Sequence, residues 1–119
     1  MFPTVRVIVE GQRDKAAVDA LLDTGFSGFL CLPTEKAVEL GLMLKGRDIV
    51  EYADGTRKDE IYFEGKVAFA GKTIVSEIYL TNSDEPLLGI KLLEGCQLLL
   101  DFVNEKLKVT RIKPKKKTD

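Results

Sequence analysis

The sequence contains no histidine and only two cysteines. Without an imidazole, the chain can form neither a Ser-His nor a Cys-His nucleophilic system, and it lacks the histidine zinc sites of metalloproteases. Any proton transfer must therefore use carboxylates, lysine or tyrosine. Cys31 and Cys96 lie in apolar segments without the C-x-x-C spacing of metal or redox sites, so we expect two buried thiols, no metal and no cofactor.

The chain also lacks a dominant charge and long hydrophobic runs. Its 18 basic and 19 acidic residues give a formal net charge of -1, which provides no overall attraction to nucleic acid. No segment approaches the ~18 apolar residues of a membrane span, and residues 1–6 lack the basic-then-apolar composition of a signal peptide. We therefore expect a cytoplasmic location and neither a membrane nor a nucleic-acid partner.

The residues that are present suffice for one folded domain. The 119 residues are 45% hydrophobic and 31% charged, a size and a balance that fit a single domain with a buried core. We predict a domain over residues 1–112 and a basic, disordered tail over residues 113–119. Contact of this tail with nucleic acid or a membrane is the alternative interpretation, but no aromatic-rich basic face accompanies it.

Apolar alternation predicts mostly strands. Val5, Val7 and Val9 alternate with polar residues, and the Asp54-Gly55 pair between apolar runs predicts a hairpin. Thr34 is the predicted N-cap of a short helix that ends at Gly41. The predicted strands cover residues 5–10, 16–22, 29–32, 49–53, 58–70, 73–81, 97–103 and 107–109, with a second short helix over 90–95. This pattern indicates a mainly β domain, closed or sandwich-like.

One carboxylate stands where an isolated charge is costly. In Leu21-Leu22-Asp23-Thr24-Gly25, an acid follows the end of an apolar strand and precedes a hydroxyl and a glycine. A buried carboxylate needs hydrogen-bond donors or a partner, and the glycine lets backbone groups approach closely. On these residues alone, an Asx turn with Asp23 as its first residue remains open beside a functional role.

A second segment, residues 86–93, must be considered together with the Asp23 segment. Together with Pro86-Leu87-Leu88-Gly89-Ile90-Lys91-Leu92-Leu93, the Asp23-Thr24-Gly25 segment resembles the retropepsin-like aspartic proteases over about residues 5–103. The similarity to the small prokaryotic, non-viral members of this family is greater still in one segment, Asp23-Thr24-Gly25-Phe26-Ser27-Gly28-Phe29-Leu30. The resemblance implies a closed β-barrel of the acid-protease fold with two short helices.

The same resemblance implies an aspartic endopeptidase that cleaves extended peptide or protein substrates. Two carboxylates that share one proton can both activate water and protonate a carbonyl oxygen. The chain contains one Asp-Thr-Gly, so the second carboxylate is expected to be Asp23 of another copy in a symmetric homodimer. Thr24 would bond across the two-fold axis, and Gly25 would let the substrate backbone come close. A non-catalytic module of the same fold, which binds peptides or serves in assembly, is the alternative.

The resemblance further assigns substrate contacts to Phe26, Ser27, Ala53, Asp54 and Gly55. Residues 52–61 would form the flap that closes over a bound peptide, while an ordinary exposed hairpin remains the other interpretation. The sequence departs from the family at Phe26, where Ala or Ser is usual, so no hydroxyl there can bond the outer oxygen of Asp23. It departs again at Ser27, where viral members have an acid. Its flap tip is charged, whereas viral relatives have a glycine-rich apolar tip.

Overall fold

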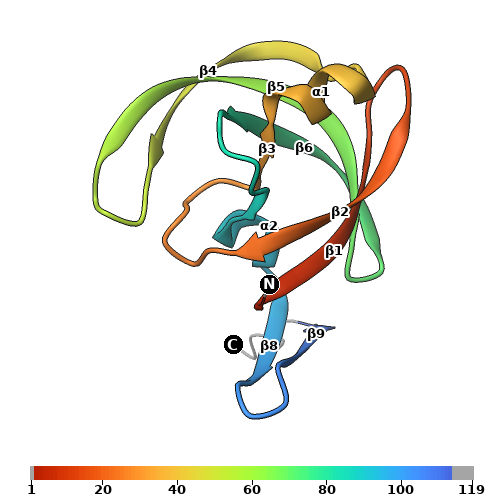
Figure 1. The fold of residues 1–119 in the computed structure, drawn as a ribbon, viewed down its shortest axis with the longest axis vertical. Coiled ribbons are helices and arrows are strands. Elements are labelled where there is room, and N and C mark those ends of the chain that lie inside the picture. The colour runs from red at the N-terminus through yellow and green to blue at the C-terminus, as the bar shows by residue number, and fades with distance from the viewer. Residues whose placement is uncertain (1, 114–119) are drawn as a thin grey trace, which may run out of the picture.

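The computed structural model describes residues 2–113 and shows a mainly β fold (Figure 1). The described residues form nine strands and two short helices. The strands are β1 (Thr4–Glu10), β2 (Lys15–Leu22), β3 (Leu30–Pro33), β4 (Met43–Glu51), β5 (Arg57–Phe69), β6 (Lys72–Thr81), β7 (Leu87–Leu88), β8 (Cys96–Asp101) and β9 (Lys106–Arg111). The helices are α1 (Thr34–Leu40) and α2 (Ile90–Leu93).

Seven of these strands form one strongly curved sheet in the order β1-β2-β7-β3-β6-β5-β4. The strand β1 pairs with β2 on one side and also with β5 on the other. The two-residue strand β7 lies between β2, to which it is parallel, and β3, to which it is antiparallel. This insertion brings residues 87–88 next to the end of β2, which leads directly into Asp23.

The core follows from the alternation of side chains along the strands. Val7 and Val9 of β1 are fully buried. The side chain of Arg6, next to Val7 on the strand, points to the opposite face, where its Nε lies 2.9 Å from Asp19 Oδ1. Across the sheet, the inward side chains of β2, β3, β5 and β6 pack on these valines. They include Val18, Ala20, Leu30, Leu32, Val67 and Ile78. At ~25 cal/mol per Å² of apolar surface, this burial is the main stabilising term.

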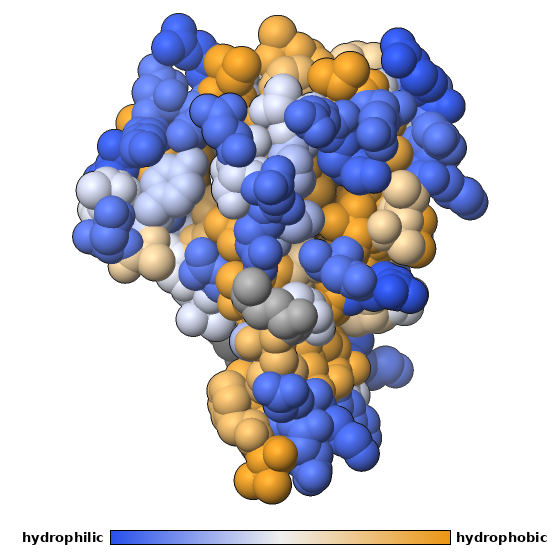
Figure 2. Space-filling view, viewed as in Figure 1, coloured by the Kyte–Doolittle hydropathy of each residue, from blue (hydrophilic) through white to orange (hydrophobic). Residues whose placement is uncertain are grey.

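The strands β8 and β9 form a separate two-stranded sheet, which we call the terminal hairpin. It projects from the lower end of the curved sheet in Figure 1. Figure 2 shows hydrophobic residues beside hydrophilic ones over this projection. Leu99 (65% exposed), Phe102 (71%) and Val103 (90%) lie on the terminal hairpin with most of their surface uncovered. A two-stranded hairpin is marginal alone, so its contacts with the rest of the molecule matter.

Most predicted elements are confirmed, but several predicted boundaries are wrong, among them the start of β4 and the end of β8. β4 begins at Met43, six residues before the predicted start at residue 49, because most of its side chains are exposed and give no alternating pattern. β8 ends at Asp101 instead of residue 103. The Asp101 carboxylate accepts the amides of Val103 and Asn104 at 2.9 and 3.1 Å, which starts the turn early.

The predicted N-cap of α1 is also wrong. Pro33 occupies the cap position with φ -56° and ψ 140°, and no side chain caps the helix. The Thr34 hydroxyl instead donates to the carbonyl of Thr81 at 3.3 Å, which ties α1 to the end of β6. The predicted stop at Gly41 is confirmed, since Gly41 takes the left-handed conformation with φ 70°.

The predicted basic tail lies almost entirely outside the part of the chain that the structure describes. Of the predicted tail 113–119, residues 114–119 lie outside the described residues. Within residues 2–113, no helix is long and apolar enough to cross a membrane.

Candidate functional site

Asp23 lies at the end of β2, in a loop that connects β2 to β3. Its backbone amide donates to the carbonyl of Leu88 at 3.0 Å, which fixes the start of the loop against β7. Its carboxylate oxygen Oδ1 accepts the amide of Gly25 at 3.0 Å. In the described part of the chain, no other hydrogen bond reaches this partly buried carboxylate. The Asx turn weighed from the sequence is therefore present, and it leaves the other oxygen, Oδ2, available to a partner.

The Asp23 loop, residues 23–29, is held from behind by the segment at β7 and α2. Gly89 donates its amide to Phe29 at 2.8 Å, and Ile90 donates to Phe26 at 3.0 Å. A Cβ on Gly89 would collide with the carbonyl oxygen of Gly28, so only glycine fits this close approach. The structure thus brings together the two segments, Asp23-Thr24-Gly25 and Leu87-Leu88-Gly89, that the sequence places about 60 residues apart.

The tip of the β4–β5 hairpin lies directly on this loop (Figure 1). A Cβ built on Gly25 would lie 2.5 Å from the Cβ of Ala53, so the two backbones are in contact. Two positions away on each segment, the Ser27 hydroxyl donates to the Glu51 carbonyl and accepts a hydrogen bond from the Glu51 amide, both at 3.2 Å. We call the hairpin tip, residues 51–57, the docked hairpin. It covers Gly25, where the resemblance to the retropepsin-like proteases implies the approach of a substrate backbone.

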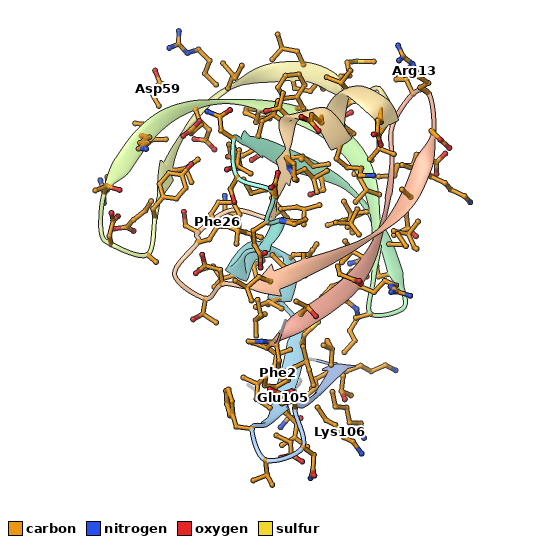
Figure 3. The ribbon with its side chains drawn as sticks, in the orientation of Figure 1. Phe2, Arg13, Phe26, Asp59, Glu105 and Lys106 are labelled. Atoms are coloured by element: carbon orange, nitrogen blue, oxygen red, sulfur yellow. The ribbon has the colours of Figure 1, made fainter. Side chains whose placement is uncertain are left out.

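Phe26 anchors the docked hairpin from below. Its side chain is 1% exposed, and Figure 3 shows it inside the Asp23 loop, facing the protein interior. The ring stacks on Tyr52 with centroids 6.2 Å apart and planes at 14°, and it meets Tyr79 edge-on at 6.1 Å. Such aromatic pairs add about 0.5–1.5 kcal/mol each beyond their buried area. Phe26 therefore helps to hold the docked hairpin in place through its contact with Tyr52.

The turn of the docked hairpin is built by Asp54 and Gly55. The Asp54 carboxylate accepts the hydroxyl of Thr56 at 2.6 Å and its amide at 3.0 Å. These bonds hold the pKa of Asp54 below its usual range, the hydroxyl having the larger effect. Gly55 has φ 84°, which favours glycine at this turn position. Thr24 and Asp54 are both exposed, Thr24 on the Asp23 loop and Asp54 on the turn above it.

A cleft of about 450 Å³ opens beside the docked hairpin. We call it the Glu60 cleft. Tyr52, Lys58 and Glu60 form one wall, and Leu80 and Leu87 contribute apolar surface. The Tyr52 hydroxyl donates to Glu60 Oε1 at 2.8 Å, and the Lys58 ammonium lies 5.6 Å from the centre of the Tyr52 ring.

The sequence did not single out Lys58 or Glu60 as site residues. A usable signal existed, because residues two apart on a strand share a face, and residues 58 and 60 lie on the strand that follows the Asp54-Gly55 turn. Burial, together with the Tyr52 bond to Glu60, raises the pKa of Tyr52 well above its usual range. Tyr52 therefore keeps its proton and remains a donor to Glu60 at neutral pH.

The site has no cluster that could hold a metal ion. Across residues 2–113, no group of three or more His, Cys, Asp or Glu side chains is arranged to bind one. Cys31 is buried at the back of the Glu60 cleft, and Cys96 is partly buried on β8. Both thiols are free. No protein-family model matches this chain, and no curated protein matches its sequence.

Proposed function

We propose that this protein is a retropepsin-like aspartic endopeptidase that acts as a homodimer, with one Asp23 carboxylate from each chain. The observation that carries the proposal is the Asp23 loop. It holds a carboxylate between β2 and β7, backed by Leu88 and Gly89 and covered by a hairpin. These are the parts that a shared-proton peptidase needs: a fixed acid, a close-approach glycine and a lid.

The sheet pairings support the closed-barrel form of this fold. Following the pairs β1–β2, β2–β7, β7–β3, β3–β6, β6–β5 and β5–β1 leads back to the starting strand. The β2–β7 and β7–β3 pairs also place the Asp23 loop around β7. The strand β4 lies outside this ring and pairs with β5, and the proposed barrel has Asp23 at one end.

The proposed chemistry uses water and two carboxylates. The ionised carboxylate takes a proton from water while the water oxygen attacks the peptide carbonyl carbon, and the protonated carboxylate donates its proton to the carbonyl oxygen. In the tetrahedral intermediate, the first carboxylate passes the proton it took from water to the amide nitrogen, one hydroxyl returns a proton to the second carboxylate, and the C–N bond breaks. A carboxylic acid and an amine leave. The docked hairpin must lift from Gly25 before a peptide can lie there as an added strand.

The terminal hairpin is the surface that we assign to the second copy. Phe102 contacts the ring of Phe2 at 5.4 Å, and Pro3 accepts the amide of Leu22 at 2.9 Å, so the hairpin is linked to the residue that precedes Asp23. Both strands pair only with each other among the described residues, which leaves their outer edges unpaired. Open edges and uncovered apolar side chains together favour pairing with an identical hairpin across a two-fold axis.

The test of catalysis is cleavage of an unfolded protein between about pH 4 and 7, the range in which a carboxylate dyad shares a proton. Asp23→Asn should lower the rate at least about a hundredfold, because removing a general acid-base group has this scale of effect. Asp19→Asn, which removes only the exposed ion pair to Arg6, is the matched control and should keep wild-type activity. Equal rates for a dimeric wild type and Asp23→Asn would refute the peptidase function.

A second candidate is a non-catalytic module that binds extended peptides. The contact between Ala53 and Gly25 favours it, because a hairpin that never lifted would leave Asp23 without a substrate. The matching experiment is peptide binding by Asp23→Ala. Binding that persists in this variant, together with no turnover by the wild type, would select the module over the enzyme.

A further inference from the structure

The Glu60 cleft lies one residue from both contacts that define the proposed active site. Leu87, on its floor, precedes Leu88, whose carbonyl accepts the Asp23 amide. Tyr52, on its wall, precedes Ala53, which touches Gly25. A side chain that enters this cleft therefore belongs to a residue near the bond that Asp23 would cut.

The cleft combines an apolar base with one half-buried carboxylate. Leu80 and Leu87 can cover a hydrocarbon stem. Glu60 uses Oε1 to accept the Tyr52 hydroxyl, and no hydrogen bond to Oε2 is present among residues 2–113. The charge of Glu60 also reaches the cleft interior, where it adds to the dominant effect of burial in raising the pKa of Cys31 to about 12. An acceptor thus faces a space wide enough for a long side chain.

The surroundings of the cleft are more acidic than basic. A smaller pocket of about 110 Å³ shares four lining residues with it, namely Thr34, Thr81, Asn82 and Ser83. This neighbour adds Glu35 and Asp84 to its lining. Lys58 is the one cation among the lining residues of the two pockets, and it is exposed over the Tyr52 ring. The combined field favours a cationic ligand group over an anionic one.

We propose that the Glu60 cleft is a specificity subsite for a long basic side chain, with its stem on Leu80 and Leu87 and its cationic head on Glu60. This inference rests on the proposed function, since it assigns the cleft to a side chain of the peptide substrate. A guanidinium is the best match, because its planar donors bond carboxylates in a defined geometry and its stem is apolar. The subsite selects arginine first and lysine second.

Binding can be measured without turnover in the Asp23→Asn variant of the full chain. The probes are three blocked Val-Val-X-Val-Val peptides in which X is arginine, norleucine or glutamate, titrated by NMR while the amides of residues 58–60, 80–85 and 87 are followed. The arginine peptide should bind at least about tenfold more tightly than the norleucine peptide, the scale of a hydrogen bond to a charged group. Shifts should centre on Glu60, Leu80 and Leu87.

Two variants decide whether Glu60 is responsible. Glu60→Gln keeps an acceptor for Tyr52 and should remove the preference for arginine, while Lys58→Gln is the matched control on the same face and should keep or increase it. Norleucine or glutamate peptides that bind as tightly, no binding by any of the three, or a preference that survives Glu60→Gln would overturn the subsite. Failure of the proposed peptidase function would be detected by a different measurement, namely equal cleavage rates for the wild type and Asp23→Asn.

Discussion

At the scale of single residues, Phe26 shows how a buried side chain can connect the Asp23 loop to the docked hairpin. The residue follows Gly25, and the family resemblance assigned it to substrate contact. The structure places the ring against Tyr52 and Tyr79, almost fully buried. It fills the space between the Asp23 loop and the docked hairpin, so its size supports the position of both.

Replacing Phe26 by alanine should therefore be costly. Removing a buried phenylalanine typically destabilises a domain by about 3–5 kcal/mol through lost transfer energy and the cavity left behind. Urea unfolding followed by fluorescence of the tyrosines would measure the loss. Val38→Ala on α1, where the side chain is 63% exposed, is the control and should change stability by less than about 0.5 kcal/mol. A Phe26→Ala cost below about 1 kcal/mol would contradict this placement of the ring.

Cys31 gives a pH prediction at the same scale. Burial, with a smaller effect of the Glu60 charge, raises its pKa to about 12, so at pH 8 only about one thiol in ten thousand is ionised. The thiolate is the form that reacts. Alkylation by iodoacetamide at pH 8 should thus be at least about a hundredfold slower in the folded protein than in urea, and should accelerate as the pH rises towards 12. Peptide mass spectrometry identifies the modified residue, and fast labelling of native Cys31 would refute the buried placement.

At the scale of elements, the important contact is between the Asp23 loop and the β4–β5 hairpin. The loop is short and held at both ends, whereas the hairpin projects from β5 and meets the loop through Ala53, Glu51 and Tyr52. Such a hairpin can open as a unit when these few contacts break. Opening is what the proposed peptidase requires, because Gly25 is covered in the docked arrangement.

Ser27→Ala should shift this equilibrium towards the open hairpin. The substitution removes both side-chain hydrogen bonds to Glu51, each with a net value of about 0.5–1.5 kcal/mol. Hydrogen exchange of the Glu51 amide should accelerate about fivefold to a hundredfold, with amides of β1 unchanged. Thr110→Ala on β9 is the control, far along the chain from the hairpin. Unchanged exchange at Glu51 would show that the Ser27 hydroxyl does not hold the hairpin down, since the Ser27 amide still donates to the Glu51 carbonyl in this variant.

At the scale of the whole molecule, the proposed peptidase needs a second carboxylate, which one copy of the chain does not supply from an Asp-Thr-Gly segment of its own. The curved sheet carries one Asp-Thr-Gly loop, and the terminal hairpin projects away from the sheet with uncovered apolar residues. Its connection to Asp23 runs through Phe2, Pro3 and Leu22. If the proposal holds, dimerisation through the terminal hairpin also completes the site. Activity after subunit mixing and the oligomeric state of a hairpin variant test the two parts independently.

Mixing chains tests the shared site. When wild type and Asp23→Asn are mixed in equal amounts and exchange subunits, about a quarter of the dimers carry two Asp23 residues, so about a quarter of the activity per dimer should remain. A site contained in one chain would retain about half. Phe102→Asp, at a 71% exposed position, should give a folded monomer without activity, as judged by sedimentation and circular dichroism. An active monomer would contradict the dimeric site.

The sequence by itself determined the order and type of most elements and the special place of Asp23. Alternating valines, the Asp54-Gly55 turn and an acid after an apolar strand are local signals, because they depend on side-chain periodicity and backbone preference within a few residues. Local signals failed where exposure removed the pattern, as at the start of β4, or where Pro33 replaced Thr34 as the helix cap.

Only the tertiary structure decided what covers Asp23 and what lies beside it. The contact of Ala53 with Gly25, the burial of Phe26 and the cleft around Glu60 join residues more than 20 positions apart. Such contacts depend on sheet curvature and strand order, which no local pattern encodes. The missing histidine pointed to carboxylate chemistry from the sequence alone, whereas the fold determined that the Asp23 amide binds Leu88, that Ala53 covers Gly25 and that Glu60 lines a cleft beside them.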